Sequence, residues 1–229
     1  MSVTGEVVCV ITRYNENLDW IGWLVKFVDR IIIYNKGDND RLFETHTDLS
    51  KVTVHKMENI GRIDHTIAHY ITTQWDTLGD RVIFLPGSIL LCKFKERYLN
   101  AIVKRIGMVR ERFRGFYGPR FHIVTPKFNY TIDQYQAEGN CNKNSNPFIK
   151  SEYTNFQTWK NALIDTRPMR YVAMRGMFII CKENILHIDK SIYQNILNSV
   201  SVGDNIENGH FAERIWGHLF RQHSFDNLN

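Results

Sequence analysis

The sequence predicts an α/β fold in which a mixed, mostly parallel sheet is flanked by helices. Short runs of β-branched and apolar residues, such as VVCVI and RVIFL, recur through the first ninety residues and are typical of buried strands. Stretches with apolar residues at helical spacing lie between several of these runs. An alternation of strands and helices favours a parallel sheet, because a parallel connection has to cross back over the sheet.

The first half of the chain supplies four of the expected strands and two of the expected helices. The strands are expected at 6–12, 30–35, 51–57 and 81–85, and the helices at 18–28 and 64–78. Each strand is followed by a polar or glycine-containing segment. In chain order, the four segments are TRYNE, YNKGDND, ENIGR and LPGS. Ligands of such sheets bind beyond the carboxyl ends of the strands. These four segments are therefore the expected location of a binding site.

The second half of the chain begins irregularly and ends in regular structure. The segment 93–113 is basic and amphipathic and predicts a helix or a pair of helices. The segment 129–159 is rich in Asn and aromatic residues and predicts a long loop region. A strand is then expected at 176–182, followed by helices at 183–200 and 209–222.

The composition is that of a globular protein with a basic charge balance. Of 229 residues, 43% are hydrophobic, and the formal net charge is +5. The positive charge favours an anionic ligand or partner, such as nucleic acid, anionic lipid or nucleotide phosphates. The four cysteines form no C-x-x-C pair, which argues against a zinc site or a disulfide framework. The chain shows neither a signal peptide nor a run of eighteen apolar residues, so we expect a soluble, cytoplasmic protein without a membrane span.

The loop between the third strand and the next helix has the composition of an anion site. Gly61 lets the backbone turn tightly, and the free amides at a helix N-terminus attract an anion. Arg62 would add a bidentate contact to a phosphate. The alternative is a turn glycine followed by an arginine in a surface ion pair, and a single glycine does not exclude it.

The segment after the second strand has residue types that can contact a nucleoside. Asn35, Lys36, Asp38 and Asp40 lie close together there, and carboxylates accept hydrogen bonds from hydroxyl and imino groups. The same residues are also typical of a simple turn. We favour the turn over a metal site for the two aspartates and leave nucleoside contact open.

Two expected helices carry histidines and acidic residues that could bind a metal or act in catalysis. His65 and His69 lie four positions apart, a spacing that can bind a metal, but one face of their helix must be core, which favours a structural role. His210 and Glu213 lie in GHFAERIWGHLF, where a partly buried glutamate could act as a general base. The sequence is equally compatible with a structural role, in which an internal ion pair between Glu213 and Arg214 holds two helices together.

Taken in order, these segments resemble the GT-A class of nucleotide-sugar glycosyltransferases, whose fold is Rossmann-related. VVCVITRYNENLDWI resembles the first strand, base-binding loop and helix of that class. IIIYNKG, NIGRIDHTIAHYI and DTLGDRVIFLPG resemble an uncharacterised fungal and viral family grouped with it, and chlorovirus-type transferases that act on capsid glycans are similar in size. RGMFIICKENIL resembles the acceptor-side strand of the class, and FAERIWGHLF resembles a helix of capsule-type glycosyltransferases. The resemblance covers roughly 5–90 and 174–221.

The resemblance implies a role for each candidate residue. It implies one GT-A-like domain over 1–229, with a nucleotide-binding half at about 1–92 and an acceptor-side half at about 93–229. The residues expected to bind the nucleotide are Thr12, Arg13, Tyr14, Asn15, Asn35, Lys36, Asp38, Arg62, His65 and Ser88, with Arg62 and His65 facing the diphosphate. The expected catalytic residues are Glu213, His210 and Asp204.

The segment after the fourth strand departs from the pattern of the GT-A class. Most of these enzymes carry an acidic pair there that holds a metal ion, whereas this chain has Pro86, Gly87 and Ser88. A metal ion usually neutralises the leaving diphosphate. The resemblance therefore leaves open a divalent ion, Mn²⁺ or Mg²⁺, held by other residues, and equally open a site that relies on Arg62 and Lys36.

The expected function is transfer of a sugar from a nucleotide diphosphate sugar, with UDP-sugar as the first expectation, to a glycan or glycoprotein acceptor. The missing acidic pair keeps a second hypothesis open, a catalytically inactive relative that binds nucleotide or glycan. A third hypothesis, a nucleic-acid-binding protein, rests on the basic and aromatic text from Lys93 to Arg120. We rank it last because it leaves the four strand-end segments unexplained.

Overall fold

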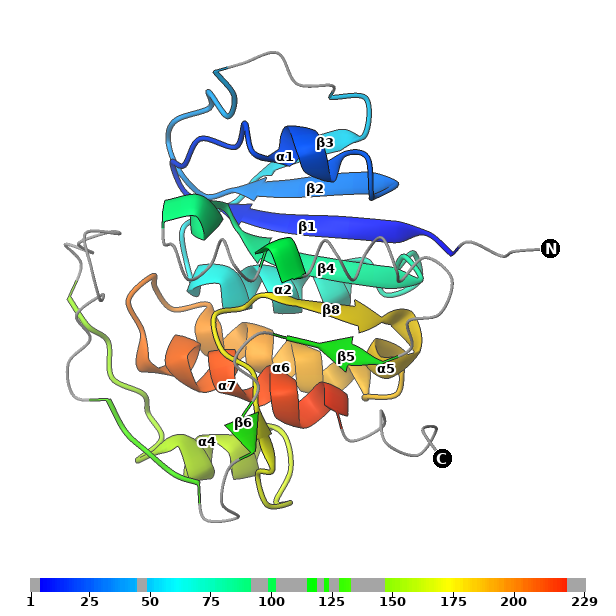
Figure 1. Cartoon of the computed structure of the whole chain (residues 1–229). Coiled ribbons are helices and arrows are strands. Elements are labelled where there is room, and N and C mark those ends of the chain that lie inside the picture. The colour runs from blue at the N-terminus through cyan, green and yellow to red at the C-terminus, as the bar shows by residue number, and fades with distance from the viewer. Residues whose placement is uncertain are drawn as a thin grey trace.

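A six-stranded sheet with the strand order β3-β2-β1-β4-β8-β5 organises the chain (Figure 1). The structure is a computed structural model, and it describes residues 5–44, 49–91, 99–101, 115–118, 122–123, 128–132 and 147–221. The strands of this sheet are β1 (Val7–Arg13), β2 (Arg30–Asn35), β3 (Val52–Lys56), β4 (Arg81–Pro86), β5 (Phe116–Tyr117) and β8 (Phe178–Cys181). A separate pair is formed by β6 (His122–Ile123) and β7 (Tyr171–Val172).

The directions of the strands confirm the mixed α/β class of the predicted fold, whereas its GT-A-like character stays a prediction. β1 pairs in parallel with both β2 and β4, and β2 pairs in parallel with β3. β8 runs antiparallel to β4, and β5 runs antiparallel to β8. The fold is therefore mixed α/β, with a mostly parallel sheet flanked by helices. The division of the chain near residue 92 stays a prediction.

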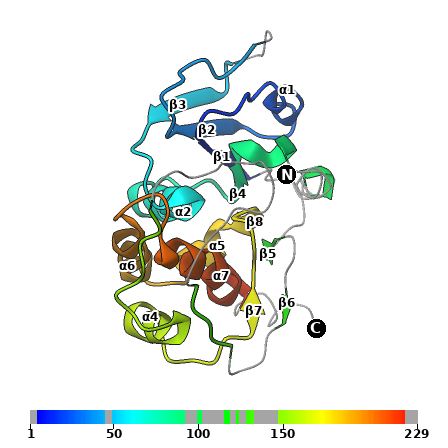
Figure 2. The ribbon, with the colours of Figure 1, turned by 90° about the vertical axis from the view of Figure 1, so that its left-hand side faces the viewer.

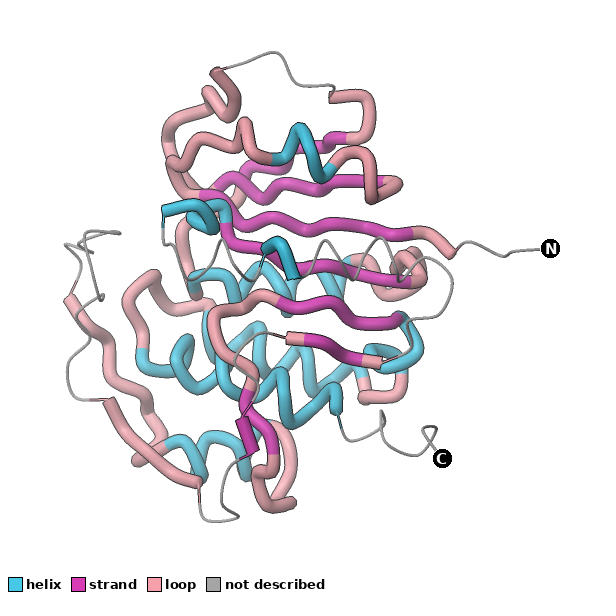
Figure 3. The backbone as a smooth tube through the Cα atoms, in the orientation of Figure 1, coloured by secondary structure: helices cyan, strands magenta, loops and turns pink. Residues whose placement is uncertain are grey.

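Helices cover both faces of the sheet (Figures 2 and 3). They are α1 (Ile21–Leu24), α2 (Arg62–Thr73), α4 (Phe156–Leu163), α5 (Lys182–Leu186), α6 (Lys190–Val200) and α7 (Glu207–Arg221), together with a 3-10 turn at Gly87–Leu91. α1 lies on one face, and α2, α6 and α7 lie on the other. The central strands therefore have to bury both of their faces, which explains their continuous apolar runs.

Alternate residues of each central strand pack into two separate cores. In β1, Val8 and Val10 join the cluster that contains α2, α6 and α7, whereas Cys9 and Ile11 join the cluster that contains α1. The period-2 geometry of a strand produces this division, because successive side chains point to opposite faces. β3 lies at the edge, and four of its five residues are exposed. The two cores hold the carboxyl ends of β1, β2 and β4 in place.

Two expected helices and one expected loop region differ from the structure. The helix expected at 18–28 contains only one turn of α-helix, α1, and the helix expected at 183–200 is broken into α5 and α6. Asp189 causes the second start, because its side chain accepts a hydrogen bond from the amide of Ser191 and caps α6. The loop region expected at 129–159 ends in α4, whose first turn is capped by Asn155. The basic segment 93–113 lies outside the described residues except at 99–101.

None of the helices within the described ranges combines the length and the apolar character that crossing a bilayer requires.

Candidate functional site

The strand register places the predicted polar segments in one row. Arg13 at the end of β1 pairs with Asn35 at the end of β2, and Asn35 pairs with Lys56 at the end of β3. On the other side of β1, Thr12 pairs with Pro86 of β4. The chain passes from β1 to β2 on one side and reaches β4 on the other, so the strand order reverses at β1. Such a reversal opens a crevice at the carboxyl ends of parallel strands, where ligands of α/β proteins bind.

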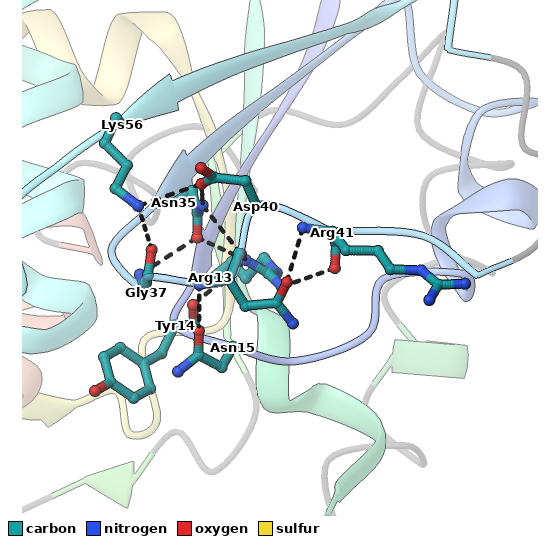
Figure 4. A network of polar contacts seen from close by, with 9 residues as sticks. Arg13, Tyr14, Asn15, Asn35, Gly37, Asp40, Arg41 and Lys56 are labelled. Carbon is teal, nitrogen blue, oxygen red and sulfur yellow. Dashed lines mark hydrogen bonds and ion pairs between the residues drawn. The ribbon is translucent and has the colours of Figure 1, made fainter.

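Arg13 organises the loop that follows β2 (Figure 4). Its guanidinium is fully buried and donates to Asn35 Oδ1 at 2.7 Å and to the carbonyl oxygen of Arg41 at 3.1 Å. Its Nε donates to the carbonyl oxygen of Glu16 at 2.7 Å. Burial lowers the pKa of Arg13, and the nearby carboxylates oppose this shift. Arg13 and Asn35, both expected to touch a nucleotide, therefore bind the chain itself and shape the loop.

Gly37 allows the loops after β1 and β2 to touch. A Cβ atom at this position would collide with the carbonyl oxygen of Tyr14 and with Asn15 Oδ1. Asn15 Oδ1 also accepts a hydrogen bond from the amide of Asn39 at 3.1 Å. The Tyr14 ring points away from this polar network and is 41% exposed (Figure 4). The close contact thus leaves an aromatic face open beside the row of strand ends.

A cavity of about 350 Å³ lies at the carboxyl ends of β1, β2 and β3. Three of the predicted residues, Tyr14, Lys36 and Asp38, line it. The remaining lining residues come from the end of β3 and the loop after it: Lys56, Met57, Glu58 and Asn59. This volume lies at the lower end of the range for small-molecule sites.

Lys36 joins the cavity to the first turn of α2. Its side chain is buried, and its Nζ donates to the carbonyl oxygens of Ile60 and Arg62, each at 2.5 Å. Burial lowers the pKa of Lys36 to about 7, and the charge of Asp64 opposes the shift. Gly61 and Arg62 both have left-handed backbone, with φ of 59° and 55°. The tied lysine holds this unusual turn against the strand ends.

Arg62 reaches from α2 to α7. Its Nη1 lies 3.2 Å from His210 Nε2. Burial lowers the pKa of His210 to about 3, and the charges of Arg62 and Arg214 contribute to the shift. His210 is therefore neutral at physiological pH. Two residues that the resemblance places in different halves of the chain thus lie in contact.

Glu213 lies one turn further along α7 and is already bonded. Its Oε1 accepts from the backbone amide of Arg175 at 2.6 Å, and its Oε2 lies 3.3 Å from Arg214 Nη1. Arg175 has a left-handed φ of 74°, and a Cβ at the following residue, Gly176, would lie 2.6 Å from Ile63. The segment before β8 is therefore pressed against the start of α2, and Glu213 fixes it there.

Asp64 is an acidic residue of this region that the sequence analysis passed over. It is buried, and its Oδ1 accepts a hydrogen bond from Trp216 Nε1 at 2.8 Å. Burial raises the pKa of Asp64 to about 7, with a further contribution from the charge of Glu213. The spacing of Trp216 in α7 predicted a core residue, but nothing in the sequence pairs it with α2. Lys56 and Glu58 were also passed over, although their place at a strand end could have indicated them.

The remaining predicted residues lie around this region in different roles. His65 stacks on His69 with ring centroids 6.0 Å apart, and burial lowers its pKa to about 3. Its Nδ1 is buried and has no hydrogen-bond partner among the residues that the structure describes. Asp204 accepts a hydrogen bond from Asn59 Nδ2 at 3.3 Å. Ser88 lies in the 3-10 turn after β4.

The described residues do not fit the metal site of the GT-A class. They contain no group of three His, Cys, Asp or Glu side chains placed to hold a metal ion. The end of β4 and the turn after it present Pro86, Gly87 and Ser88, none of which is a carboxylate.

A scan against protein-family models finds no match to this chain, and neither does a search of curated proteins. The site has to be interpreted from its own geometry.

Proposed function

We propose that the chain is a GT-A-like glycosyltransferase that moves a sugar from a nucleoside diphosphate sugar to a glycan or glycoprotein acceptor. The observation that carries the proposal is the contact between Arg62 and His210. Lys36, which lines a cavity at the carboxyl ends of β1, β2 and β3, joins that cavity to the contact by donating to the carbonyl oxygen of Arg62. A donor in the cavity would extend past Lys36 toward Arg62. The acceptor would approach from the side of α7.

The charges support this orientation of the donor. The cavity lining carries two lysines and two carboxylates and is therefore balanced. Near α7, the charges of two arginines, Arg62 and Arg214, both act on His210, and Arg214 Nη1 also lies 3.3 Å from Glu213 Oε2. A diphosphate carries negative charge, so it is stabilised better near the arginines than in the cavity. The nucleoside then occupies the cavity.

In the proposed reaction, an acceptor oxygen forms a bond to the anomeric carbon of the sugar. The bond from that carbon to the diphosphate breaks, and the nucleoside diphosphate leaves with the electron pair. Glu213 takes the proton of the acceptor hydroxyl. Its two bonds from Arg175 and Arg214 hold the carboxylate in one orientation and leave lone pairs free. Asp204 orients Asn59, a lining residue of the cavity.

The test is release of nucleoside diphosphate from a panel of nucleotide sugars, with and without Mn²⁺. Glu213→Gln should bind the donor but release diphosphate at least about a hundredfold more slowly, because general-base catalysis contributes a factor of that order. Glu183→Gln, which changes an exposed carboxylate of α5, is the matched control. Equal rates for Glu213→Gln and the wild type would remove Glu213 from the mechanism.

A second candidate function is binding of a nucleotide or glycan without turnover. It is favoured by the turn after β4, which has no carboxylate. Donor binding without release of diphosphate from any nucleotide sugar would establish it in place of the transferase.

A further inference from the structure

Two lining residues offer the cavity hydrogen-bond acceptors that the described part of the chain leaves unpaired. Lys36 Nζ is tied to two carbonyl oxygens, and Lys56 Nζ donates to the carbonyl oxygen of Gly37 at 2.5 Å and lies 3.2 Å from Asp40 Oδ1. Within the described ranges, the carboxylates of Asp38 and Glu58 take part in no hydrogen bond or ion pair. Both are exposed, and both line the cavity. The cations of the cavity are therefore engaged, and its carboxylates are available.

An ionised carboxylate accepts hydrogen bonds and cannot donate them. The cavity consequently suits a part of the ligand that presents several donors better than it suits a phosphate group. Tyr14 adds an exposed aromatic face on which a flat base can stack. The combination of a ring face and two free carboxylates matches a nucleobase with its ribose.

We propose that the base is guanine, and that Asp38 and Glu58 select it. Guanine presents two adjacent donors, its N1–H and its exocyclic amino group, which one carboxylate can accept together. Uracil presents one N–H between two carbonyl oxygens, and those oxygens would face the carboxylate. Adenine and cytosine each place an acceptor nitrogen beside their amino group. The inference rests on the proposed function and replaces the UDP-sugar expected from the sequence with a GDP-sugar.

The second carboxylate serves the ribose. The two adjacent hydroxyls of the ribose are also donors. An acidic residue that accepts hydrogen bonds from them is a common element of nucleotide sites. The proposal therefore assigns one carboxylate to the base edge and the other to the sugar edge of the same nucleoside.

The experiment is isothermal titration of the full chain with GDP, IDP and UDP. IDP is the matched probe, because its base is guanine without the exocyclic amino group. We expect GDP to bind about tenfold to a hundredfold more tightly than IDP, which is the range for one hydrogen bond to a charged group. UDP should bind more weakly than GDP by at least the same factor.

Variants show whether the carboxylates cause the preference. The variants are Asp38→Asn and Glu58→Gln. The one that replaces the carboxylate bound to the base should bring the affinities for GDP and IDP within about threefold of each other. Asp76→Asn removes an exposed carboxylate beyond the far end of α2 and should keep the wild-type preference.

Three results would overturn the inference. UDP binding as tightly as GDP would exclude selection of guanine while leaving the proposed function standing. Equal affinities for GDP and IDP would show that the amino group is not read. If neither GDP, IDP nor UDP bound, the proposed function would fail together with the inference.

Discussion

Arg62 and His210 are separated by 148 positions, yet Arg62 Nη1 lies 3.2 Å from His210 Nε2. The contact joins the first turn of α2 to α7 at the carboxyl edge of the sheet. Arg62 reaches it from a left-handed backbone conformation, which is costly for a residue with a Cβ. Lys36 holds that conformation by binding the carbonyl oxygen of Arg62. Strain kept at one residue beside a cavity is typical of a functional site.

Two replacements of Arg62 should differ in their stability but share the same loss of nucleotide affinity. Arg62→Gly relieves the left-handed backbone, so it should be more stable than Arg62→Ala by about 1 kcal/mol. Both variants lose the guanidinium and should bind a nucleoside diphosphate at least tenfold more weakly than the wild type. Urea unfolding and titration calorimetry measure the two effects. Unchanged diphosphate affinity in both variants would exclude Arg62 from the binding site.

Adding one methyl group at Gly37 should disrupt the cavity. The new Cβ would collide with the backbone of Tyr14, which cannot rotate away as a side chain can. We expect Gly37→Ala to destabilise the fold by roughly 1–3 kcal/mol and to abolish nucleotide binding. In Gly209→Ala, the nearest atom is Ile206 Cγ1 at 3.4 Å, so this control in α7 should be tolerated. Full binding by Gly37→Ala would contradict the described loop contact.

Asp64 should make stability depend on pH in an unusual direction. Its folded pKa of about 7 lies above its ordinary value of 3.8, so the folded state binds the proton more tightly. This contribution is complete below pH 3.8 and is lost as the pH rises toward 7, at most about 1.4 kcal/mol per pH unit. Asp64→Asn keeps an acceptor for Trp216 and removes the titration. The stability of the variant relative to the wild type should therefore grow between pH 4 and pH 7.

Chemical denaturation at several pH values tests this expectation. Asp64→Ala is the contrasting variant, because it leaves the buried Trp216 N–H without its acceptor and should lose about 1–3 kcal/mol at every pH. Identical pH profiles for Asp64→Asn and the wild type would show that Asp64 does not titrate in this window.

Asp165 should be a centre of acid sensitivity outside the site. It binds the fully buried Lys160 Nζ at 2.9 Å, Arg167 at 2.6 Å and His218 at 3.3 Å. Burial alone would raise the pKa of Asp165, but the hydrogen bonds from His218, Lys160 and Arg167 hold it well below its ordinary value. Stability from this group is therefore present above pH 3.8 and is lost as the pH falls below it.

Two variants separate the buried and the exposed parts of that cluster. Asp165→Asn should cost about 3 kcal/mol in thermal or urea unfolding, because Lys160 stays buried without its counter-ion. Arg167→Met removes only the exposed partner and should cost at most about 1 kcal/mol. Equal losses in the two variants would contradict the central role of Asp165.

The apolar pattern predicted burial more accurately than it predicted hydrogen bonding. The predicted bounds of β2 agree with the structure, and those of β1 and β4 differ by one residue, because continuous apolar runs in central strands have few alternatives. Around α1, the predicted apolar face is buried, including Leu18, Leu24 and Val28, although only one turn is α-helical. Apolar spacing reports which side chains face a core, and it does not report whether the backbone continues as a helix.

Capping residues could have corrected two of the errors. Asn155 and Thr158 form a capping box at the start of α4, inside the region predicted as loop. Asp189 marks the start of α6. Both signals are local and were present in the sequence. The two-residue strands β5, β6 and β7 carry no comparable local signal.

The sequence predicted the residues of the candidate site only where their position follows from the end of a predicted strand. Tyr14, Lys36 and Asp38 lie together because the carboxyl ends of parallel strands share one edge. The burial of Arg13 depends on how the loop after β2 folds back, and the pairing of Asp64 with Trp216 depends on where α7 packs. Local residue patterns predict neither of these contacts.

The most direct test of the central claim is thermal unfolding of the chain with UDP, GDP, CMP and their sugars, each with and without Mn²⁺. A ligand at about 100 times its dissociation constant should stabilise the folded state by about 2.7 kcal/mol, which a melting curve resolves. We predict such a shift for at least one nucleoside diphosphate, and a stabilisation reduced to about half or less in Arg62→Ala at the same ligand concentration. If none of these nucleotides shifts the melting temperature, the chain does not bind a nucleotide-sugar donor and the account is contradicted.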